Sequence, residues 1–375
     1  MCDFTEEKTR LFFICDAHSS ALKPALQRKK KNRKTKNCRR RMPSLTFMPQ
    51  KTRCPQQGRN VIERGGGKHQ TMRFRMRAKT TDDDDDDDDD DEKELMMLQN
   101  EFTAFAIELA EAANKETLKY WRKTSLGVET KNDASPVTVA DKNAETAMRT
   151  LVKSRYPSHA IFGEEHGIEL GLEEKSDDTH EYLWVFDPID GTKSFITGKP
   201  LWGTLIALLR DGEPVLGVLE QPVLKERWIG CKGTQTTFNG DPVSVHGDEQ
   251  KELNEALMYS TTPLMFYDEN EVRYERLKRK VKIPMFGCDC YAYGLLASGF
   301  CDIVCEADLK PYDYMALVPI VLGAGGRMTD WEGEPLKFVV EEEGGDGESF
   351  QGEVLAAASE RLWKASVASL KKQTR

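Results

Sequence analysis

The apolar side chains between residues 95 and 156 repeat with the period of amphipathic helices. In the first run they fall mostly three or four residues apart, at Leu95, Leu98, Phe102, Phe105, Leu109, Ala113 and Trp121. This spacing places them on one face of a helix, and residues 140–156 show the same period. Pro157 ends the second run because proline lacks the amide hydrogen that a helix interior requires. The pattern therefore predicts two helices at the start of the folded domain.

Short apolar runs separated by turn residues follow the two helices. They predict strands at residues 160–162, 182–186, 203–209, 214–219, 227–231 and 242–245. Asp211-Gly212 and Asn239-Gly240 are typical of tight hairpin turns. This part of the chain is therefore expected to contain antiparallel hairpins.

The second half of the chain mixes strands and helices. The predicted strands are 257–260, 301–305 and 327–329, the predicted helices are 291–298 and 312–322, and a final strand and helix lie within 354–370. Residues 341–347 are acidic and glycine-rich and are expected to form a surface loop. Helices mixed with hairpins predict a layered α+β architecture. Because one core of this size is near the upper limit for a domain, we expect two lobes, at about 94–245 and 246–375.

Charge sets the first ninety residues apart from the rest. Residues 1–80 hold 22 lysines and arginines against 5 acidic residues, and ten aspartates follow at 82–91. Neither segment can bury enough apolar surface to offset the entropy lost on folding. We therefore predict a disordered leader at residues 1–93 and assign the folded domain to residues 94–375.

The basic leader has three interpretations. It fits an organelle transit segment, although Asp3, Glu6 and Glu7 are unusual in one. It also fits a poorly constrained leader, or a nuclear-import or nucleic-acid patch, and nucleic acid is the partner that we expect least. With a transit segment the expected compartment is the plastid (chloroplast), and without one it is the cytoplasm.

Cysteine spacing and hydropathy narrow the class of protein further. The nine cysteines include no Cys-x-x-Cys pair, which argues against a zinc site. No segment resembles a cleavable signal peptide, and the apolar run at residues 315–326 is too short to span a bilayer. We therefore expect a soluble protein of a reducing compartment with no membrane partner.

Candidate chemistry is concentrated in residues 184–192, Trp-Val-Phe-Asp-Pro-Ile-Asp-Gly-Thr. An apolar run ends in Asp187 and Asp190, and Gly191-Thr192 follows where a helix is expected to begin. Two carboxylates beside a helix N-terminus suit a phosphate group bridged to divalent cations. The same Asp-Pro-x-Asp-Gly pattern is also good turn chemistry, so the motif alone leaves both interpretations open.

Further acidic residues lie at strand ends and helix starts. They are Asp141, Glu164, Glu165 and Asp313. Each alone could be a helix cap or a polar loop residue. Carboxylates that converge repel one another unless cations neutralise them, and oxygen ligands favour Mg²⁺. Two such ions can clamp the attacking and leaving oxygens of an in-line displacement, so together these residues predict hydrolysis of a phosphate monoester.

Three motifs in the chain resemble the inositol monophosphatase superfamily. They are Gly-Glu-Glu-His at 163–166, the segment 184–192 and the helix-start Asp313, within a resemblance that runs from about 98 to 370. The resemblance implies an α+β fold, a layered αβαβα sandwich of the inositol monophosphatase and fructose-1,6-bisphosphatase type. It also implies a lithium-sensitive phosphatase that binds about two or three Mg²⁺ ions per site. Such an enzyme would act on a small-molecule phosphate monoester and form a homodimer.

The resemblance also assigns roles to single residues. The implied metal ligands are Glu164, Asp187, the carbonyl of Ile189, Asp190 and Asp313. Glu164, Thr192 and Asp141 are the implied catalytic residues, since Thr192 and Asp141 would orient the attacking water. Glu165 would support the metal site, and the backbone N–H groups of Gly191 and Thr192 would hold the phosphate.

Substrate selection is expected from Asp289 and Glu306. Residues 287–289 form the turn before the predicted helix at 291–298. In inositol phosphatases this turn is typically Gly-Thr-Ala, whereas here Asp289 stands at the alanine position. Two carboxylates facing the leaving group suit a cationic substrate, although Asp289 could also cap the helix at 291–298. Residues 287–294 and 306–314 resemble the histidinol-phosphatase branch, which implies hydrolysis of L-histidinol phosphate to L-histidinol in histidine biosynthesis. The alternatives are an inositol-1-monophosphatase or other sugar monophosphatase, and an inactive fold with a nucleic-acid-binding tail.

Overall fold

The computed structural model describes residues 93, 95–123, 129–130, 136–172, 181–248, 250–338 and 352–372. The leader predicted at residues 1–93 lies, except for Lys93, outside the described residues. The surface loop predicted at residues 341–347 lies outside them too.

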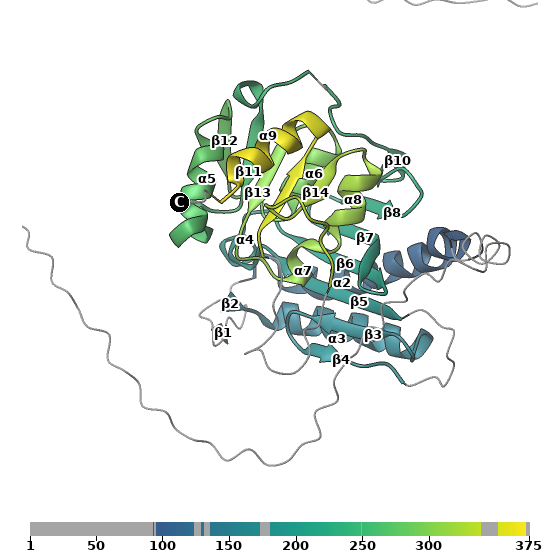
Figure 1. The fold of residues 1–375 in the computed structure, drawn as a ribbon. Coiled ribbons are helices and arrows are strands. Elements are labelled where there is room, and N and C mark those ends of the chain that lie inside the picture. The colour runs from purple at the N-terminus through teal and green to yellow at the C-terminus, as the bar shows by residue number, and fades with distance from the viewer. Residues whose placement is uncertain are drawn as a thin grey trace, which may run out of the picture. The chain divides into compact units, whose positions relative to one another are not determined.

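An eight-stranded sheet forms the first β layer, in the strand order β10-β9-β8-β7-β6-β5-β3-β4 (Figure 1). Its strands are β3 (Ala160–Gly163), β4 (Gly167–Glu169), β5 (Tyr182–Asp190), β6 (Gly203–Arg210), β7 (Glu213–Gln221), β8 (Glu226–Cys231), β9 (Thr237–Phe238) and β10 (Asp241–Pro242). Neighbouring strands are antiparallel except β3 and β5, which run parallel. The predicted turns at Asp211-Gly212 and Asn239-Gly240 connect β6 to β7 and β9 to β10, and all four turn residues have positive φ.

Both faces of this sheet are buried at its central strands β5, β6 and β7, where successive side chains point to opposite faces and nearly all are buried. In β5, Trp184 and Phe186 pack with η1 (Leu98–Phe102), α2 (Thr103–Tyr120) and α3 (Val139–Arg155). Leu183 and Val185 belong to the core on the opposite face. The strand is therefore apolar throughout instead of alternating.

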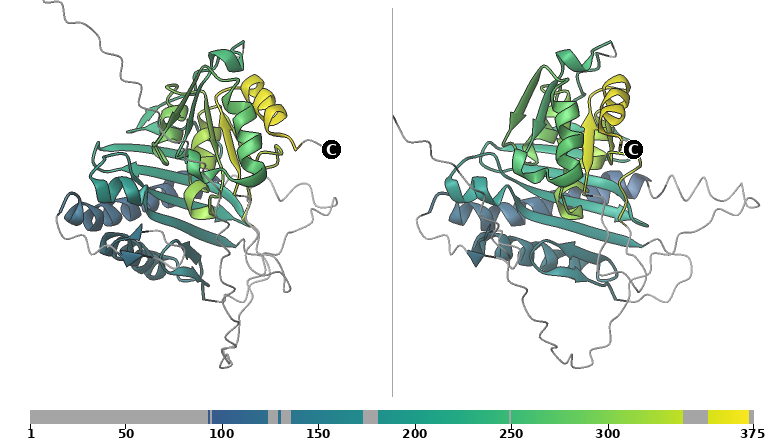
Figure 2. Two further views of the ribbon diagram at one scale, coloured as in Figure 1. Left: turned by 90° about the vertical axis from the view of Figure 1, so that its left-hand side faces the viewer. Right: turned by 60° about the vertical axis from the view of Figure 1, so that its left-hand side comes forward.

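A five-stranded sheet forms the second β layer, in the order β12-β11-β13-β15-β14. Its strands are β11 (Leu257–Ser260), β12 (Ile283–Phe286), β13 (Ile303–Glu306), β14 (Arg327–Thr329) and β15 (Val354–Ala357). The helices α6 (Tyr291–Ala297) and α8 (Leu317–Gly323) pack between the sheets. The helices α5 (Asp268–Lys278) and α9 (Glu360–Leu370) cover the outer face of the second sheet (Figure 2). The layers alternate as αβαβα, which confirms the predicted fold class.

Several elements differ from the sequence expectation. The sequence pattern does not predict α5 or β12, because only three residues of α5 are buried and β12 is an edge strand. The helix predicted at 312–322 is two helices, α7 (Pro311–Tyr314) and α8, since Pro319 is tolerated only in the first turn of a helix. The strand predicted at 242–245 is reduced to β10. The remaining short elements are β1 (Glu129–Thr130), β2 (Pro136–Val137), α4 (Thr192–Thr197), η2 (Leu253–Glu255) and η3 (Pro263–Met265).

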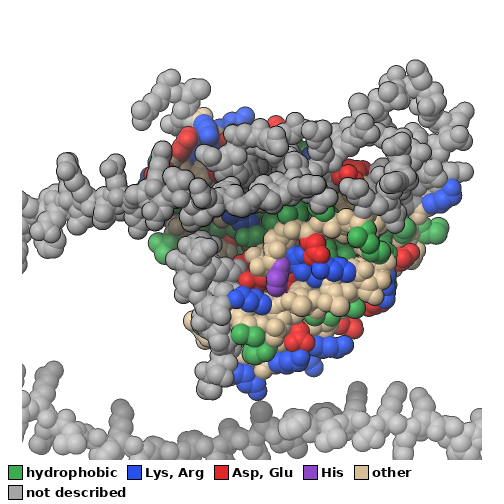
Figure 3. Space-filling model, turned by 90° about the horizontal axis from the view of Figure 1, so that it is seen from below, with side chains coloured by type: hydrophobic (Ala, Val, Ile, Leu, Met, Phe, Trp, Pro, Cys, Tyr) green, Lys and Arg blue, Asp and Glu red, His purple; other side chains and the backbone are tan. Residues whose placement is uncertain are grey.

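Charged side chains of both signs are interspersed on the face that carries α3 and β4 (Figure 3). Arg149 and Lys153 both pair with Glu169, and Arg155 pairs with Glu108. A surface that binds nucleic acid is typically dominated by positive charge, which the described part of this face is not. Within the described residues, no helix has the length and apolar composition of a membrane span.

His159 lies in an aromatic cluster that holds its imidazole neutral. The ring stacks between Tyr156 and Tyr182, at centroid distances of 4.8 and 4.9 Å, and Nδ1 accepts a hydrogen bond of 3.1 Å from Trp184 Nε1. Burial lowers the pKa of His159 to about 4. Since the unfolded chain takes up this proton near pH 6.5, folding stability should fall as the pH drops from about 6.5 to about 4.

We expect His159 to account for about 2 kcal/mol of this loss, after allowing for its partial exposure. His159→Gln keeps an acceptor for Trp184, so its free energy of unfolding should fall less over the same pH range. Urea denaturation at about pH 7 and about pH 4.5 measures the difference. The exposed residue His246 supplies the matched control, His246→Gln. Parallel pH profiles for wild type and His159→Gln would contradict the prediction.

Candidate active site

The end of β5 brings two carboxylates to one edge of the first sheet. The pairing of β5 with β6 shifts register between Asp187 and Asp190, so the strand bulges where the acidic residues stand. Gly191 follows with φ +86°, a left-handed conformation that favours glycine, and α4 begins at the next residue. The local sequence therefore ends the strand and turns the chain directly after Asp190.

Asp313 joins these two residues from α7. Carboxylate oxygens of Asp187, Asp190 and Asp313 all lie within 4.8 Å of one another, and we call these three residues the acidic cluster. Each is oriented by a backbone N–H: that of Ile189 donates to Asp187 at 3.0 Å, and that of Lys310 donates to Asp313 at 2.7 Å. The third donor is the N–H of Cys290, which lies 2.5 Å from Asp190 Oδ2.

Burial and mutual repulsion make the acidic cluster unfavourable without a counter-charge. Burial raises the pKa of Asp187, and the charges of Glu164, Asp190 and Asp313 raise it further. The pKa of Asp190 is also raised, by burial and then by Asp289 and Asp313. Burial and the charge of Glu164 raise the pKa of Asp313 to about 8. A divalent cation would offset this repulsion, and the oxygen-only donors fit Mg²⁺.

Glu164 is the first residue of the turn between β3 and β4 and lies within electrostatic reach of the acidic cluster. Its charge raises the pKa of Asp187 and of Asp313. Glu165 is the next residue of the turn, and its backbone N–H donates to Glu145 at 2.7 Å. The structure therefore brings Glu164 to the acidic cluster and anchors Glu165 on α3.

Asp141 stands in the first turn of α3 with one oxygen used and one unpartnered. Its Oδ2 accepts the backbone N–H of Thr138 at 3.0 Å and the Thr138 hydroxyl. Its Oδ1 is buried and has no hydrogen-bond partner among the described residues. Burial and the charge of Glu164 raise the pKa of Asp141 to about 6, opposed by the Thr138 hydrogen bonds.

For Asp141 and Asp313 the sequence allowed a helix-capping role as the alternative to a role in the site. The structure shows that each residue has part of that capping role. Both residues occupy the third helical position and accept the backbone N–H of the N-cap residue, which is Thr138 for Asp141 and Lys310 for Asp313. The backbone role occupies one carboxylate oxygen of each residue and is compatible with a ligand at the other. Thr192 directs its hydroxyl to the carbonyl of Ile189 at 3.2 Å, so its proton is not given to Asp141.

Asp289 and Glu306 lie on the side of the site formed by the second half of the chain. Asp289 has φ +49° and accepts the Ser194 hydroxyl at 3.0 Å, and the N-cap of α6 is Cys290, so Asp289 is not the helix cap. A Cβ placed on Gly191 would lie 3.1 Å from the Asp289 carboxylate, which therefore faces the turn after β5. The charge of Asp289 adds to burial in raising the pKa of Glu306.

Glu306 is fixed by two donors. The N–H of Thr261 and the hydroxyl of Tyr293 each donate to one of its carboxylate oxygens, both at 2.8 Å. Its charge, after burial and Glu164, also contributes to the raised pKa of Asp313. Glu306 therefore interacts electrostatically with both Asp289 and Asp313.

The sequence interpretation missed Glu145, a buried carboxylate under the turn that carries Glu164. A signal was available, because Glu145 stands four residues after Asp141 and so on the same helix face, beside the apolar Ala144 and Met148. An acidic side chain on the buried face of a helix needs a partner.

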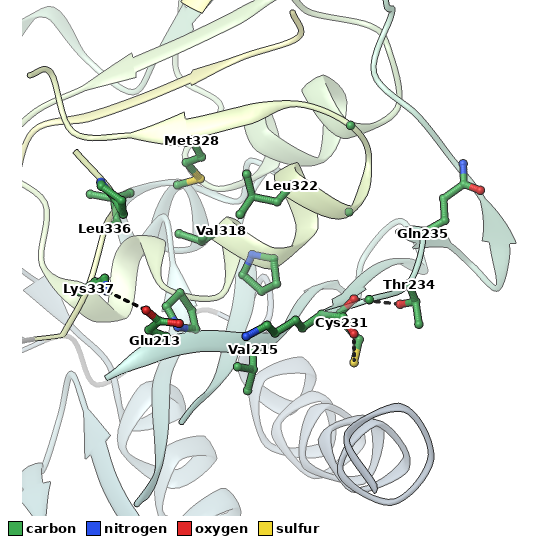
Figure 4. Close-up of a pocket in the computed structure, with 17 residues that line it drawn as sticks. Glu213, Val215, Cys231, Thr234, Gln235, Val318, Leu322, Met328, Leu336 and Lys337 are labelled. Atoms are coloured by element: carbon green, nitrogen blue, oxygen red, sulfur yellow. Dashed lines mark hydrogen bonds and ion pairs between the residues drawn. The ribbon is translucent and has the colours of Figure 1, made fainter. Parts of the chain in front are cut away.

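A separate pocket of about 640 Å³ is lined by parts of β7, β8 and α8 (Figure 4). Glu213 and Lys337 pair in it at 2.7 Å. In the sheet, Glu213 of β7 lies opposite Arg210 of β6, and Arg210 lies opposite Tyr182 at the beginning of β5. Because Asp190 is the last residue of β5, the pocket lies at the other end of the sheet. None of the predicted site residues lines this pocket.

The αβαβα layers and the oxygen-only acidic cluster define a phosphatase sandwich of the inositol monophosphatase and fructose-1,6-bisphosphatase type. The family model described as the inositol monophosphatase family matches residues 98–369, so the chain belongs to this family. It is a phosphatase of that family, as the resemblance predicted.

Individual relatives include histidinol-phosphatases. The chain is 51% identical over 235 residues to "Bifunctional phosphatase IMPL2, chloroplastic" of Arabidopsis thaliana, in a match that covers 63% of this chain and 66% of that protein. It is 35% identical to a histidinol-phosphatase of Chlorobaculum parvum, over 61% of this chain and 85% of that protein. A solved inositol monophosphatase from Zymomonas mobilis is 38% identical, with a TM-score of 0.60 over 74% of this chain and 98% of its own. The chain spans about two thirds of the Arabidopsis protein. The family match and the histidinol-phosphatase relatives confirm the predicted superfamily and branch.

Proposed function

We propose that the chain hydrolyses L-histidinol phosphate to L-histidinol and phosphate in histidine biosynthesis. The observation that carries the proposal is the Asp289 carboxylate, which faces the Gly191 turn beside the acidic cluster. Together with Glu306 it offers two negative charges to a leaving group, which suits the amine and imidazole of L-histidinol better than a neutral polyol. The histidinol-phosphatases among the relatives support the same substrate.

The proposed Mg²⁺ ligands are those that the resemblance implies. They are Glu164, Asp187, the carbonyl of Ile189, Asp190 and Asp313, for about two or three ions. When bound, the cations supply a nucleophilic water at neutral pH and offset the charge on the phosphate. Support comes from the mutual repulsion of the carboxylates, which a cation would relieve.

The chain's own groups would orient the reactants. The buried Oδ1 of Asp141 can accept a hydrogen bond from the attacking water, which would satisfy an otherwise unpartnered atom. The hydroxyl of Thr192 would assist, and the N–H groups of Gly191 and Thr192 would hold the phosphate oxygens. Glu165 would support the metal site from the adjacent position in the turn. On the other side, Asp289 and Glu306 would bind the leaving group.

The proposal includes a plastid location and a homodimer. The word "chloroplastic" in the name of the Arabidopsis relative supports the plastid, and the basic leader is compatible with it. An inositol-1-phosphate phosphatase is the second candidate within the family, and one tomato relative, 31% identical, is named inositol monophosphatase 3. The inactive-fold alternative loses support because every proposed acidic ligand is present.

Phosphate release by the full chain tests the proposed substrate. With Mg²⁺ present, kcat/KM for L-histidinol phosphate should exceed that for inositol 1-phosphate by about tenfold or more, because charge-assisted contacts add about 1.5–3 kcal/mol. Excess EDTA should abolish release from both. A preference for inositol 1-phosphate would leave the metal site intact and refute the substrate assignment. No release from either would refute both.

A further inference from the structure

The turn between β3 and β4 carries Glu164 and is closed by the pairing of Gly163 with Gly167. The N–H of Glu164 donates to the carbonyl of Phe186 in β5 at 3.2 Å. The beginning of the turn is therefore tied to the strand that leads into the acidic cluster.

The carboxylate of Glu145, on α3, fills the concave side of this turn. It accepts the backbone N–H groups of Glu165 at 2.7 Å and of His166 at 3.2 Å. Glu145 is 0% exposed, and a Cβ at Gly163 would overlap its carboxylate, so the close approach requires glycine there. Glu145 thus takes the place of water as the partner of two amides of the turn.

Arg149, one turn further along α3, donates hydrogen bonds both to Glu145 and to residues of β4. Its Nε donates to Glu145 at 2.7 Å, and its guanidinium also donates to the carbonyl of Gly167 and, at 3.2 Å, to Glu169. A buried carboxylate with a guanidinium and two amides as partners has its charge satisfied and its geometry restricted. The pair therefore contacts both the tip of the turn and β4.

The helix that carries this pair also carries Asp141. Asp141 and Glu145 are four residues apart and share one face of α3. Through Glu145, the turn that carries Glu164 is therefore attached to the helix that carries Asp141.

We propose that Glu145 is a positioning residue for the metal site: held by Arg149, it fixes the turn that aims Glu164 at the acidic cluster. This inference rests on the proposed function, since it requires Glu164 to be a Mg²⁺ ligand. Glu145 itself contacts neither cation nor substrate. Residues that orient a metal ligand without touching the metal typically change metal affinity about 10- to 100-fold when substituted.

Glu145→Gln tests the proposal. The side chain keeps its size, but its NH₂ group replaces one of the two oxygens that accept hydrogen bonds from Arg149 and from the amides of the turn. Isothermal titration calorimetry of the full chain with Mg²⁺ should give a dissociation constant raised about tenfold or more. The Mg²⁺ concentration for half-maximal phosphatase activity should rise by the same factor. At saturating Mg²⁺, kcat should stay within about threefold of wild type, since the ligands themselves are unchanged.

Val152→Ala, in the core on the same helix, is the matched control for a loss of stability alone. It should lower the melting temperature and leave the Mg²⁺ dissociation constant unchanged. Arg149→Lys, which keeps the positive charge and loses the guanidinium fork, should weaken Mg²⁺ binding by a smaller factor than Glu145→Gln and provides a second variant if that one does not fold.

Wild-type Mg²⁺ affinity in Glu145→Gln and Arg149→Lys would overturn the proposal and leave the proposed function standing. An equal loss of affinity in Val152→Ala would also overturn it, since Glu145 would then act only through stability. Absence of Mg²⁺ binding by the wild-type chain would instead refute the proposed metal site, and the inference with it.

Discussion

Replacing Asp187 with asparagine should lower kcat/KM by at least about a thousandfold, which corresponds to about 4 kcal/mol. Asp187 is 2% exposed, and burial and the neighbouring carboxylates raise its pKa. Asparagine keeps the size of the side chain and an acceptor for the Ile189 N–H, but it removes the charge that would bind a divalent cation. We therefore expect the loss to come from metal binding and not from unfolding.

Thermal denaturation separates these two causes for Asp187→Asn. Removing one of several mutually repelling carboxylates should leave the metal-free protein at least as stable as wild type. Mg²⁺ should raise the melting temperature of the wild type but not of the variant, since a bound ligand stabilises the folded state. Asp211→Asn, in the exposed β6–β7 turn, is the control and should keep full activity. Activity within about tenfold of wild type would remove Asp187 from the metal site.

Asp289→Asn should reduce the preference for L-histidinol phosphate over inositol 1-phosphate by about 10- to 100-fold. A hydrogen bond to a charged group contributes about 1.5–3 kcal/mol, and about 1.4 kcal/mol is a tenfold change. Asparagine tolerates the left-handed backbone of this position, φ +49°, and can still accept the Ser194 hydroxyl. Because only the negative charge is lost, only the cationic substrate should lose binding energy.

The ratio of kcat/KM for the two substrates at saturating Mg²⁺ is the measurement for Asp289. Asp289→Ala should give the same direction of change, with some loss of stability because alanine is strained at positive φ. Ser194→Ala removes the hydroxyl donor and leaves the carboxylate, so it should change the ratio much less. An equal loss on both substrates would mean that Asp289 supports the acidic cluster and does not select the substrate.

The turn that follows β5 could be predicted from the sequence because the information is local. A continuous apolar run followed by a proline and a glycine marks where a buried strand ends. The strand predicted at 182–186 continues in the structure to Asp190, through a bulge that contains Pro188, and the chain turns at Gly191, where the motif predicted a helix start. The helices α2 and α3 were predictable for a similar reason, since their apolar faces repeat over several turns.

Features that depend on an unknown neighbour could not be predicted. The place of Glu145 on the buried face of its helix could be read from the sequence, but its partners, two amides of the β3–β4 turn, could not. For Asp289 the sequence allowed both a helix cap and a substrate contact, and only the folded chain, with Ser194 as its partner, excluded the cap. The helix α5 escaped prediction because it buries too few residues to give a clear period.

The sequence by itself determined the layered α+β class, the order of most elements and the family, because periodicity and contiguous motifs are local properties. Only the tertiary structure decided which carboxylates meet. Asp313 reaches the end of β5 from α7, and Glu306 and Asp289 approach from the second sheet and the start of α6. Polar side chains so far apart in the chain are brought together by the packing of the layers, which hydrophobic periodicity does not encode.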